Sequence, residues 1–117
     1  MDLASKKCVP CEIGTPPLSP EQYKPLLEQL KLEWEMIEDK RSLRSSDLKK
    51  IRHEFKFKDF VESMKFVNQV ADLAEDEGHH PNIHIYYSKV VIDLTTHNIK
   101  GLSENDFILA AKIEELS

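Results

Sequence analysis

The segment from Ile51 to Lys58 alternates apolar and charged side chains, and this pattern most constrains the fold. Ile51, His53, Phe55 and Phe57 take every second position, and the residues between them are Arg52, Glu54, Lys56 and Lys58. A period of two is typical of a strand with one face in the core and the other in water. His53 falls on the apolar face, where we interpret it as a hydrogen-bonded histidine at the edge of the core rather than a catalytic group.

Alternation of the same kind predicts three further strands. Leu32, Trp34 and Met36 alternate with glutamates, and a polar turn is expected at residues 39–42. Apolar residues take alternate positions at Ile83, Ile85 and Tyr87 and again at Val90, Ile92 and Leu94, with Ser88 and Lys89 between the two runs. We therefore expect four strands in two antiparallel, hairpin-like pairs.

Three capping patterns predict helices before, between and after these strand pairs. The pairs are Ser19 with Gln22, Asp59 with Glu62, and Ser103 with Asp106, and an apolar stripe follows each. Pro25 lies inside the first helix, which should therefore be kinked or start late. The order α-β-β-α-β-β-α predicts an α+β fold in which three helices pack on one face of a four-stranded antiparallel sheet.

The second helix, expected over residues 59–77, has more apolar surface than one sheet face requires. Its core stripe is Phe60, Met64, Val67, Ala71 and Ala74, and a second row, Phe66, Val70 and Leu73, runs beside it. Gly78 follows and can end the helix in a left-handed conformation. We expect the second row to lie between copies of the chain in an oligomer.

Composition narrows the class of protein. The chain has 117 residues, 40% of them hydrophobic and 32% charged, which fits one globular domain at 18–117 after an arm at 1–17. A formal net charge of -5 argues against direct nucleic-acid binding. No apolar run has the length of a membrane span or the character of a secretory signal. The expected location is the cytoplasm, with the nucleus left open.

The arm contains a Cys-x-x-Cys motif, Cys8 and Cys11. This spacing suits a redox motif or half of a zinc site. However, the segment is rich in proline and glycine and does not join a strand to a helix. We therefore expect a solvent-exposed pair of thiols, without a role in chemistry, in an arm that packs on the surface.

Three histidines flank the second strand pair. His79 and His80 follow the long helix, and a hairpin would return His97 to the same end of the sheet. Pro81 restricts His80 to an extended conformation. Imidazoles grouped there suit acid–base chemistry near neutral pH. The same residues leave a metal site open, in which His79 or His80 joins His84 and His97 with a carboxylate from Glu75, Asp76 or Asp106.

Several short motifs resemble the signature of one family. They are Gly78-His79-His80-Pro81, Thr95-Thr96-His97, and Gly101-Leu102-Ser103 with Asp106, supported by Leu18, Ser19, Trp34, residues 55–60, Tyr87, Val90 and Leu94. The chain resembles the pterin-4a-carbinolamine dehydratases, also known as the dimerisation cofactor of a homeodomain transcription factor. This resemblance implies the α+β fold, a homotetramer, and no metal or other cofactor. It also implies dehydration of the 4a-hydroxytetrahydropterin left by aromatic amino-acid hydroxylases, giving quinonoid dihydropterin.

The resemblance also implies a site. His79 and His97 would be the acid–base pair, and His80 would bind and orient the pterin. The substrate-binding residues would be Glu75, Gly78, His79, His80, Pro81, Thr95, Thr96, His97, Asn98 and Asp106. Many relatives carry a polar or acidic residue where this chain has Gly78, so an orienting bond should be missing unless Glu75 supplies it. The alternative is a non-catalytic interaction module, and no motif indicates a transcription-factor partner.

Overall fold

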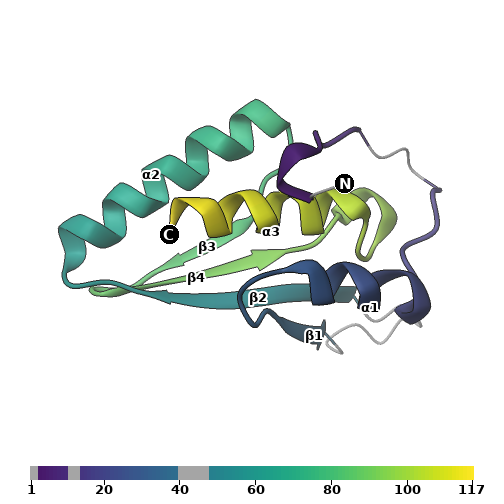
Figure 1. The fold of residues 1–117 in the computed structure, drawn as a ribbon, viewed down its shortest axis with the longest axis horizontal. Coiled ribbons are helices and arrows are strands. Elements are labelled where there is room, and N and C mark those ends of the chain that lie inside the picture. Colours follow the sequence, from purple (N-terminus) through teal and green to yellow (C-terminus); the bar gives the residue numbers. More distant parts are fainter. Residues whose placement is uncertain (1–2, 11–13, 40–47) are drawn as a thin grey trace.

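Four antiparallel strands form the sheet of the computed structural model, which describes residues 3–10, 14–39 and 48–117 (Figure 1). The strands are β1 (Glu35–Asp39), β2 (Leu48–Lys56), β3 (Asn82–Ile85) and β4 (Lys89–Leu94), in the order β1-β2-β4-β3. The helices α1 (Pro20–Gln29), α2 (Phe60–Glu77) and α3 (Glu104–Leu116) lie on one face. These elements confirm the predicted α+β class. Two short 3-10 helices, η1 (Leu3–Ser5) and η2 (His97–Ile99), were not predicted.

β2 lies inside the sheet and joins the two strand pairs. Ile51 pairs with Leu94 and Phe55 with Val90 across the β2–β4 ladder, and all four side chains are buried. The alternation in β2 therefore places its apolar face under the helices, as predicted.

The first strand begins later than predicted, at Glu35 rather than Leu32. The carboxylate of Glu114 in α3 accepts hydrogen bonds from the Lys31 N–H at 3.0 Å and the Leu32 N–H at 2.7 Å. It also accepts from Nε1 of Trp34 at 3.0 Å. These bonds tie residues 31–34 to a helix instead of a neighbouring strand. Most of the predicted turn at 39–42 lies outside the described residues.

The third strand ends earlier than predicted. The Tyr86 N–H donates to the Lys89 carbonyl at 2.8 Å, which closes the hairpin before Tyr87. Tyr87 and Ile85 are exposed, and Ile83 is half-buried. The expected apolar face of Ile83, Ile85 and Tyr87 is therefore wrong beyond Ile83: Ile85 lies in the edge strand β3 but is exposed, and Tyr87 lies in the turn.

The predicted caps start the helices. α1 begins at Pro20, with the Ser19 N–H donating to Oε1 of Gln22 at 2.8 Å, so a late start is wrong even though Pro25 lies inside the helix. In α2 the Asp59 carboxylate accepts from the Glu62 N–H at 2.9 Å. Gly78 ends α2 at a φ of 65°, the predicted left-handed conformation.

The second apolar row of α2 belongs to the core of the chain itself. Phe66 and Val70 are buried, and the Phe66 ring lies 4.7 Å from that of Phe55 and 5.0 Å from that of Phe57, between ring centroids. Ala71 of the expected core stripe is exposed. The prediction that the second row forms an oligomer interface is wrong, because α2 faces both the sheet and α3 and needs a wider apolar stripe.

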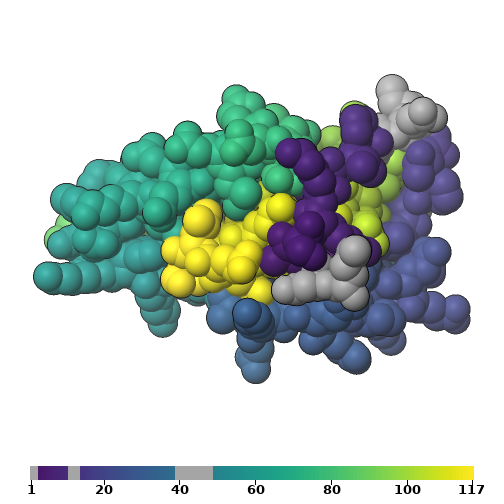
Figure 2. Space-filling view, turned by 45° about the horizontal axis from the view of Figure 1, so that its top comes forward, coloured from purple at the N-terminus to yellow at the C-terminus, as the bar shows by residue number. Residues whose placement is uncertain are grey.

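The N-terminal arm packs on the helices. In Figure 2 the purple arm lies across the yellow α3 helix and reaches the teal α2 helix. Leu3 and Cys8 are buried and belong to the hydrophobic core. The expectation of an exposed Cys8 is therefore wrong, and Cys11 lies outside the described residues. Within the ranges that the structure describes, no helix combines the length and apolar character needed to cross a membrane.

Candidate active site

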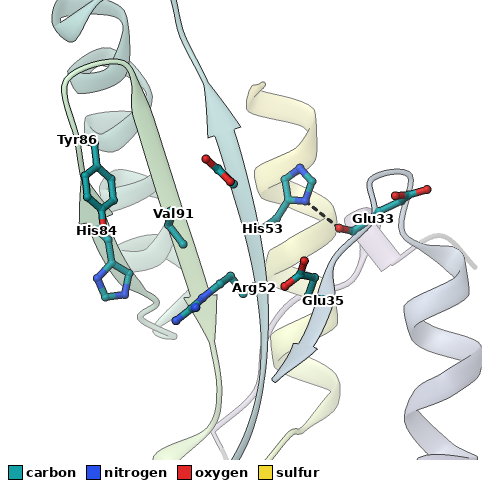
Figure 3. Close-up of a pocket in the computed structure, with 8 residues that line it drawn as sticks. Glu33, Glu35, Arg52, His53, His84, Tyr86 and Val91 are labelled. Atoms are coloured by element: carbon teal, nitrogen blue, oxygen red, sulfur yellow. Dashed lines mark hydrogen bonds between the residues drawn. The ribbon is translucent and has the colours of Figure 1, made fainter. Parts of the chain in front are cut away.

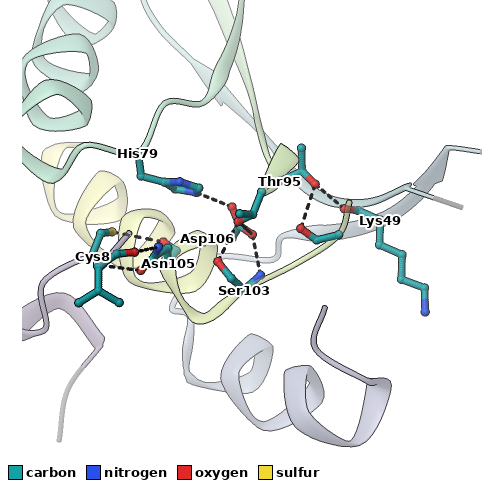
Figure 4. Close-up of polar contacts among 10 residues, drawn as sticks. Cys8, Lys49, His79, Thr95, Ser103, Asn105 and Asp106 are labelled. Atoms are coloured by element: carbon teal, nitrogen blue, oxygen red, sulfur yellow. Dashed lines mark hydrogen bonds and ion pairs between the residues drawn. The ribbon is translucent and has the colours of Figure 1, made fainter. Parts of the chain in front are cut away.

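The carboxylate of Asp106 is the centre of the polar contacts at one end of the sheet (Figure 4). It is fully buried. Its Oδ2 accepts hydrogen bonds from the Ser103 N–H and from Oγ1 of Thr96, each at 2.9 Å. Its Oδ1 lies 2.6 Å from Nε2 of His79, a length typical of a charge-assisted hydrogen bond. Because an ionised carboxylate only accepts, Nε2 of His79 donates here, which leaves Nδ1 as the nitrogen that can exchange a proton.

The end of α2 turns the two adjacent histidines in opposite directions. The left-handed Gly78 lets the His79 N–H donate to the Ala74 carbonyl at 3.2 Å, closing the helix. The His79 side chain then lies against Asp106 and is mostly buried. The His80 side chain is exposed, and its Nε2 lies 3.1 Å from Oε2 of Glu75, also exposed. Glu75 therefore contacts His80, and Asp106 contacts His79.

The second motif lies in a closed loop after β4. Thr96 and Gly101 form a β-bridge, with the Thr96 N–H donating to the Gly101 carbonyl at 2.9 Å. A Cβ on Gly101 would lie 2.6 Å from Cβ of Pro17, so the loop needs glycine at this position. His97 is exposed within the loop, in η2.

The two threonines of this motif have different roles. Oγ1 of Thr96 contacts both Asp106, at 2.9 Å, and Oγ of Ser103, at 2.8 Å. Oγ1 of Thr95 donates to the Lys49 carbonyl in β2 at 2.8 Å. Thr95 therefore holds the sheet together, whereas Thr96 supports the carboxylate that contacts His79.

A pocket of about 230 Å³ lies beside His79. Its lining residues are Val9, Pro10, Glu77, Gly78, His79, Thr96, Asn98 and Asn105. The pocket thus lies between the motif that contains Gly78 and His79 and the motif that contains Thr96. Asp106 contacts His79 from behind the pocket wall. His80, Pro81, Glu75, Thr95 and His97 are not among its lining residues.

Sequence reasoning missed four of the lining residues, namely Val9, Pro10, Glu77 and Asn105. Asn105 and Glu77 adjoin the motifs, so their neighbourhood was available as a signal. Nothing in the sequence indicates that Val9 and Pro10 of the arm reach this pocket.

A larger hollow of about 560 Å³ lies on the sheet face away from the helices (Figure 3). There Arg52 contacts Asp93 at 2.6 and 3.0 Å, and Nε2 of His84 lies 3.1 Å from Oδ2 of Asp93. Burial raises the pKa of Asp93, but the hydrogen bonds from Arg52 and His84 and the charge of Lys50 lower it to about 2 overall. The hollow contains neither motif, so the smaller pocket is the candidate site.

The contacts of His53 and His84 decide the remaining predictions about histidines. Nδ1 of His53 lies 3.0 Å from the Glu33 carbonyl, and the His53 ring lies beside Trp34 and Phe55, which confirms a hydrogen-bonded histidine at the edge of the core. His84 contacts Asp93 and not the groups around His79. The alternative metal site is therefore not assembled, and among the described residues no group of three or more His, Cys, Asp and Glu side chains suits a metal.

The fold and the pocket define a small α+β protein with a histidine–carboxylate pair at a small pocket. A model of the family described as pterin 4 alpha carbinolamine dehydratase matches residues 16–116. A relative from Alkaliphilus metalliredigens, provisionally named as a pterin-4-alpha-carbinolamine dehydratase, is 46% identical over 114 residues, covering 97% of this chain and 95% of its own length. The chain belongs to the pterin-4a-carbinolamine dehydratase family.

Two solved structures have a similar fold. A crystal structure of a transcriptional coactivator/pterin dehydratase from Brucella melitensis has a TM-score of 0.72 and 28% identity, covering 86% of this chain and 97% of that one. A pterin dehydratase-like protein described as a RuBisCO assembly factor in the alpha-carboxysome has a TM-score of 0.55 and 23% identity, covering 71% and 87%. The second protein shares the fold alone.

Proposed function

We propose that this chain dehydrates 4a-hydroxytetrahydropterin to quinonoid dihydropterin by histidine acid–base catalysis. The observation that carries the proposal is the His79 imidazole, which is held by the buried Asp106 carboxylate at the wall of the pocket. In this reaction the C4a–O bond breaks and the hydroxyl leaves as water after taking a proton. N5 loses its proton, and the freed electron pair forms the C4a–N5 double bond. The reaction therefore needs one proton donor and one acceptor.

His79 and His97 are the proposed acid–base pair. The Asp106 contact fixes the ring of His79 and stabilises its charged form during proton transfer. His97 lies in the loop closed by Thr96 and Gly101, next to the lining residue Asn98. In this proposal the pterin lies along residues 78–80 and 95–98. The exposed His80 binds and orients the pterin, and Glu75 contacts the His80 ring.

The proposed biological role is recycling of the pterin cofactor of aromatic amino-acid hydroxylases, with 4a-hydroxytetrahydrobiopterin as the substrate. The family assignment supports this role. The reaction needs no metal in this mechanism, because imidazoles can give and take protons near neutral pH. We expect dehydration to continue unchanged after dialysis against a chelator. Loss of activity that one metal restores would contradict the mechanism.

The test is turnover of synthetic 4a-hydroxytetrahydropterin by single histidine variants. His79→Ala and His97→Ala should each lower kcat by about a hundredfold, since each removes a proton-transfer group. His80→Ala should act mainly on KM, since a group that holds the ring in both states changes apparent affinity. His84→Gln is the matched control, because His84 lies on the far face of the sheet.

Circular dichroism and thermal melting should first show that each variant folds. A folded His79→Ala, His97→Ala double variant should lose more activity than either single variant. Its loss can be smaller than the product of the two single losses, because the two groups share one task. Dehydration by that double variant at the parental rate would contradict the assignment and favour the non-catalytic interaction module.

We also propose that the chain forms a homotetramer, as the family resemblance implies. Physical support comes from exposed apolar side chains near the start of α2 and in the β3–β4 hairpin: Phe60, Val61, Ile85, Tyr86 and Tyr87. Oγ of Ser63 lies 3.3 Å from the Tyr87 carbonyl, which places the two groups side by side. A second copy that covers this patch would remove it from water. Sedimentation should show an oligomer that Val61→Glu weakens, and a monomer at micromolar concentration would contradict the proposal.

A further inference from the structure

We infer that Val9 and Pro10 of the N-terminal arm form one wall of the pocket at His79, and that Asn105 is the positioning residue that holds this wall. The inference rests on the proposed function and deepens it. It assigns part of the pterin's binding affinity to a segment that precedes the first of the two histidine motifs by about seventy residues.

The first support is the way Asn105 binds the arm (Figure 4). The Val9 N–H donates to Oδ1 of Asn105 at 3.0 Å, and Nδ2 of Asn105 donates to the Val9 carbonyl. One buried side-chain amide thus satisfies both backbone polar groups of Val9, much as a neighbouring strand would. This pairing fixes the position of Val9 on the helix.

A second set of contacts holds the preceding residue. The Cys8 N–H donates to Oε1 of Glu77 at 2.8 Å, and Sγ of Cys8 lies 3.6 Å from the Asn105 carbonyl. Glu77 is also paired with Lys112 at 3.3 Å. Burial raises the pKa of Glu77, but the Cys8 hydrogen bond and Lys112 lower it overall. The Glu77 carboxylate is therefore charged when it holds the arm. The arm is therefore attached to both α2 and α3.

The residues that hold the arm adjoin those that form the proposed catalytic pair. Glu77 is two residues before His79, and Asn105 is directly before Asp106. The end of α2 and the start of α3 thus contact the arm and also carry the His79–Asp106 contact. Because the same backbone segments support both, the arm lies at a fixed place relative to the imidazole.

The Val9 side chain is available to a ligand. Its backbone is fully paired, yet the residue is 64% exposed, and it lines the pocket together with Pro10. The pocket lining also includes the polar residues His79 and Asn98. A flat, nitrogen-rich ring such as a pterin fits this combination, with its apolar face on Val9 and Pro10 and its polar edge on the polar groups.

The test compares pterin binding with turnover in two arm variants. The binding probe is 7,8-dihydrobiopterin, which has no 4a-hydroxyl group and cannot be dehydrated. Val9→Ala and Asn105→Ala should each raise its Kd, and the KM of the reaction, by about tenfold while kcat stays within about threefold. Lys6→Ala is the matched control, because the Lys6 ammonium pairs with Glu104 at 3.3 Å and Lys6 is not among the residues that line this pocket. It should leave Kd, KM and kcat unchanged.

A double variant separates positioning from a general loss of structure. If Asn105 acts through the wall, Val9→Ala should cause little further loss in the Asn105→Ala background, whereas independent effects would multiply. Val9→Ala keeps every backbone bond of the arm, so it tests the wall even if Asn105→Ala does not fold. Unchanged Kd and KM in folded Val9→Ala would overturn the inference.

The two proposals fail in different ways. A parent protein that binds 7,8-dihydrobiopterin but does not dehydrate the substrate contradicts the proposed reaction, and the Kd comparison still decides the role of the arm. A parent protein that turns over normally and whose variants all bind alike contradicts the arm's role alone. A parent protein that binds no pterin overturns both.

Discussion

Nε2 of His79 lies 2.6 Å from Oδ1 of Asp106, and this contact joins the end of α2 to the start of α3. The same carboxylate accepts from the Ser103 N–H, which makes Asp106 part of the cap of α3 as well as the partner of the imidazole. One buried side chain therefore both starts a helix and orients the proposed catalytic group.

Replacement of Asp106 by asparagine should separate these two tasks. Asp106→Asn keeps the shape of the side chain but removes its charge, so His79 loses the group that stabilises its protonated form. We expect kcat to fall by at least about tenfold with a smaller change in KM. Ser103→Ala is the control, since it keeps the backbone donor to Asp106 and should change kcat much less. An Asp106→Asn variant with parental kcat would refute the orienting role.

The Glu75–His80 contact should affect binding rather than stability. Both side chains are largely exposed, and exposed ion pairs contribute little to folding. Glu75→Gln should change the free energy of unfolding by less than about 0.5 kcal/mol. It should raise KM in the same direction as His80→Ala, because His80 would lose the group that orients it. Steady-state kinetics and urea denaturation measure the two effects, and a large loss of stability would show that the pair has a structural role instead.

Acid stability should depend on Asp93. Its pKa is lowered to about 2 in the folded chain, whereas an unfolded aspartate titrates near about 3.9. Its contribution, about 2 to 3 kcal/mol, is therefore present above about pH 4 and is lost as the pH falls towards 2. Urea unfolding between pH 6 and pH 2 should show a steeper loss in the parent than in Asp93→Asn. Equal pH dependence in both proteins would rule out this role.

The Cys8 thiol should resist alkylation in the folded chain. Burial, followed by the charge of Glu77, raises its pKa to about 12, so almost no thiolate forms at neutral pH. In a Cys11→Ser background, iodoacetamide at pH 7.5 should react with Cys8 at least about a hundredfold more slowly than after unfolding in urea. Mass spectrometry over time gives both rates. Rapid modification of the folded protein would show that the arm leaves the helices readily.

Local patterns in the sequence predicted most of the elements but not how they meet. The alternation in β2 and the caps at Ser19, Asp59 and Ser103 depend on neighbouring residues, so their positions were predictable. The pairing of β2 with β4 depends on contacts about forty residues apart, which no local period reports.

The site divides in the same way. The two histidine motifs could be recognised because each is continuous in sequence. The bonds from Asn105 to Val9 span 96 positions, and they depend on where the arm crosses α3. For the same reason, burial of Cys8 could not be predicted from a segment rich in proline and glycine.

The bond from the Ser103 N–H to Oδ2 of Asp106 also gives the protein a built-in spectroscopic reporter. The resonance frequency of an amide proton responds to the charge of its acceptor, and this acceptor belongs to the carboxylate that contacts His79. Ser103 itself is not among the residues that line the pocket beside His79. Its NMR signal should therefore follow changes at the imidazole without contact between Ser103 and the bound molecule, and it can be monitored in the unmodified chain.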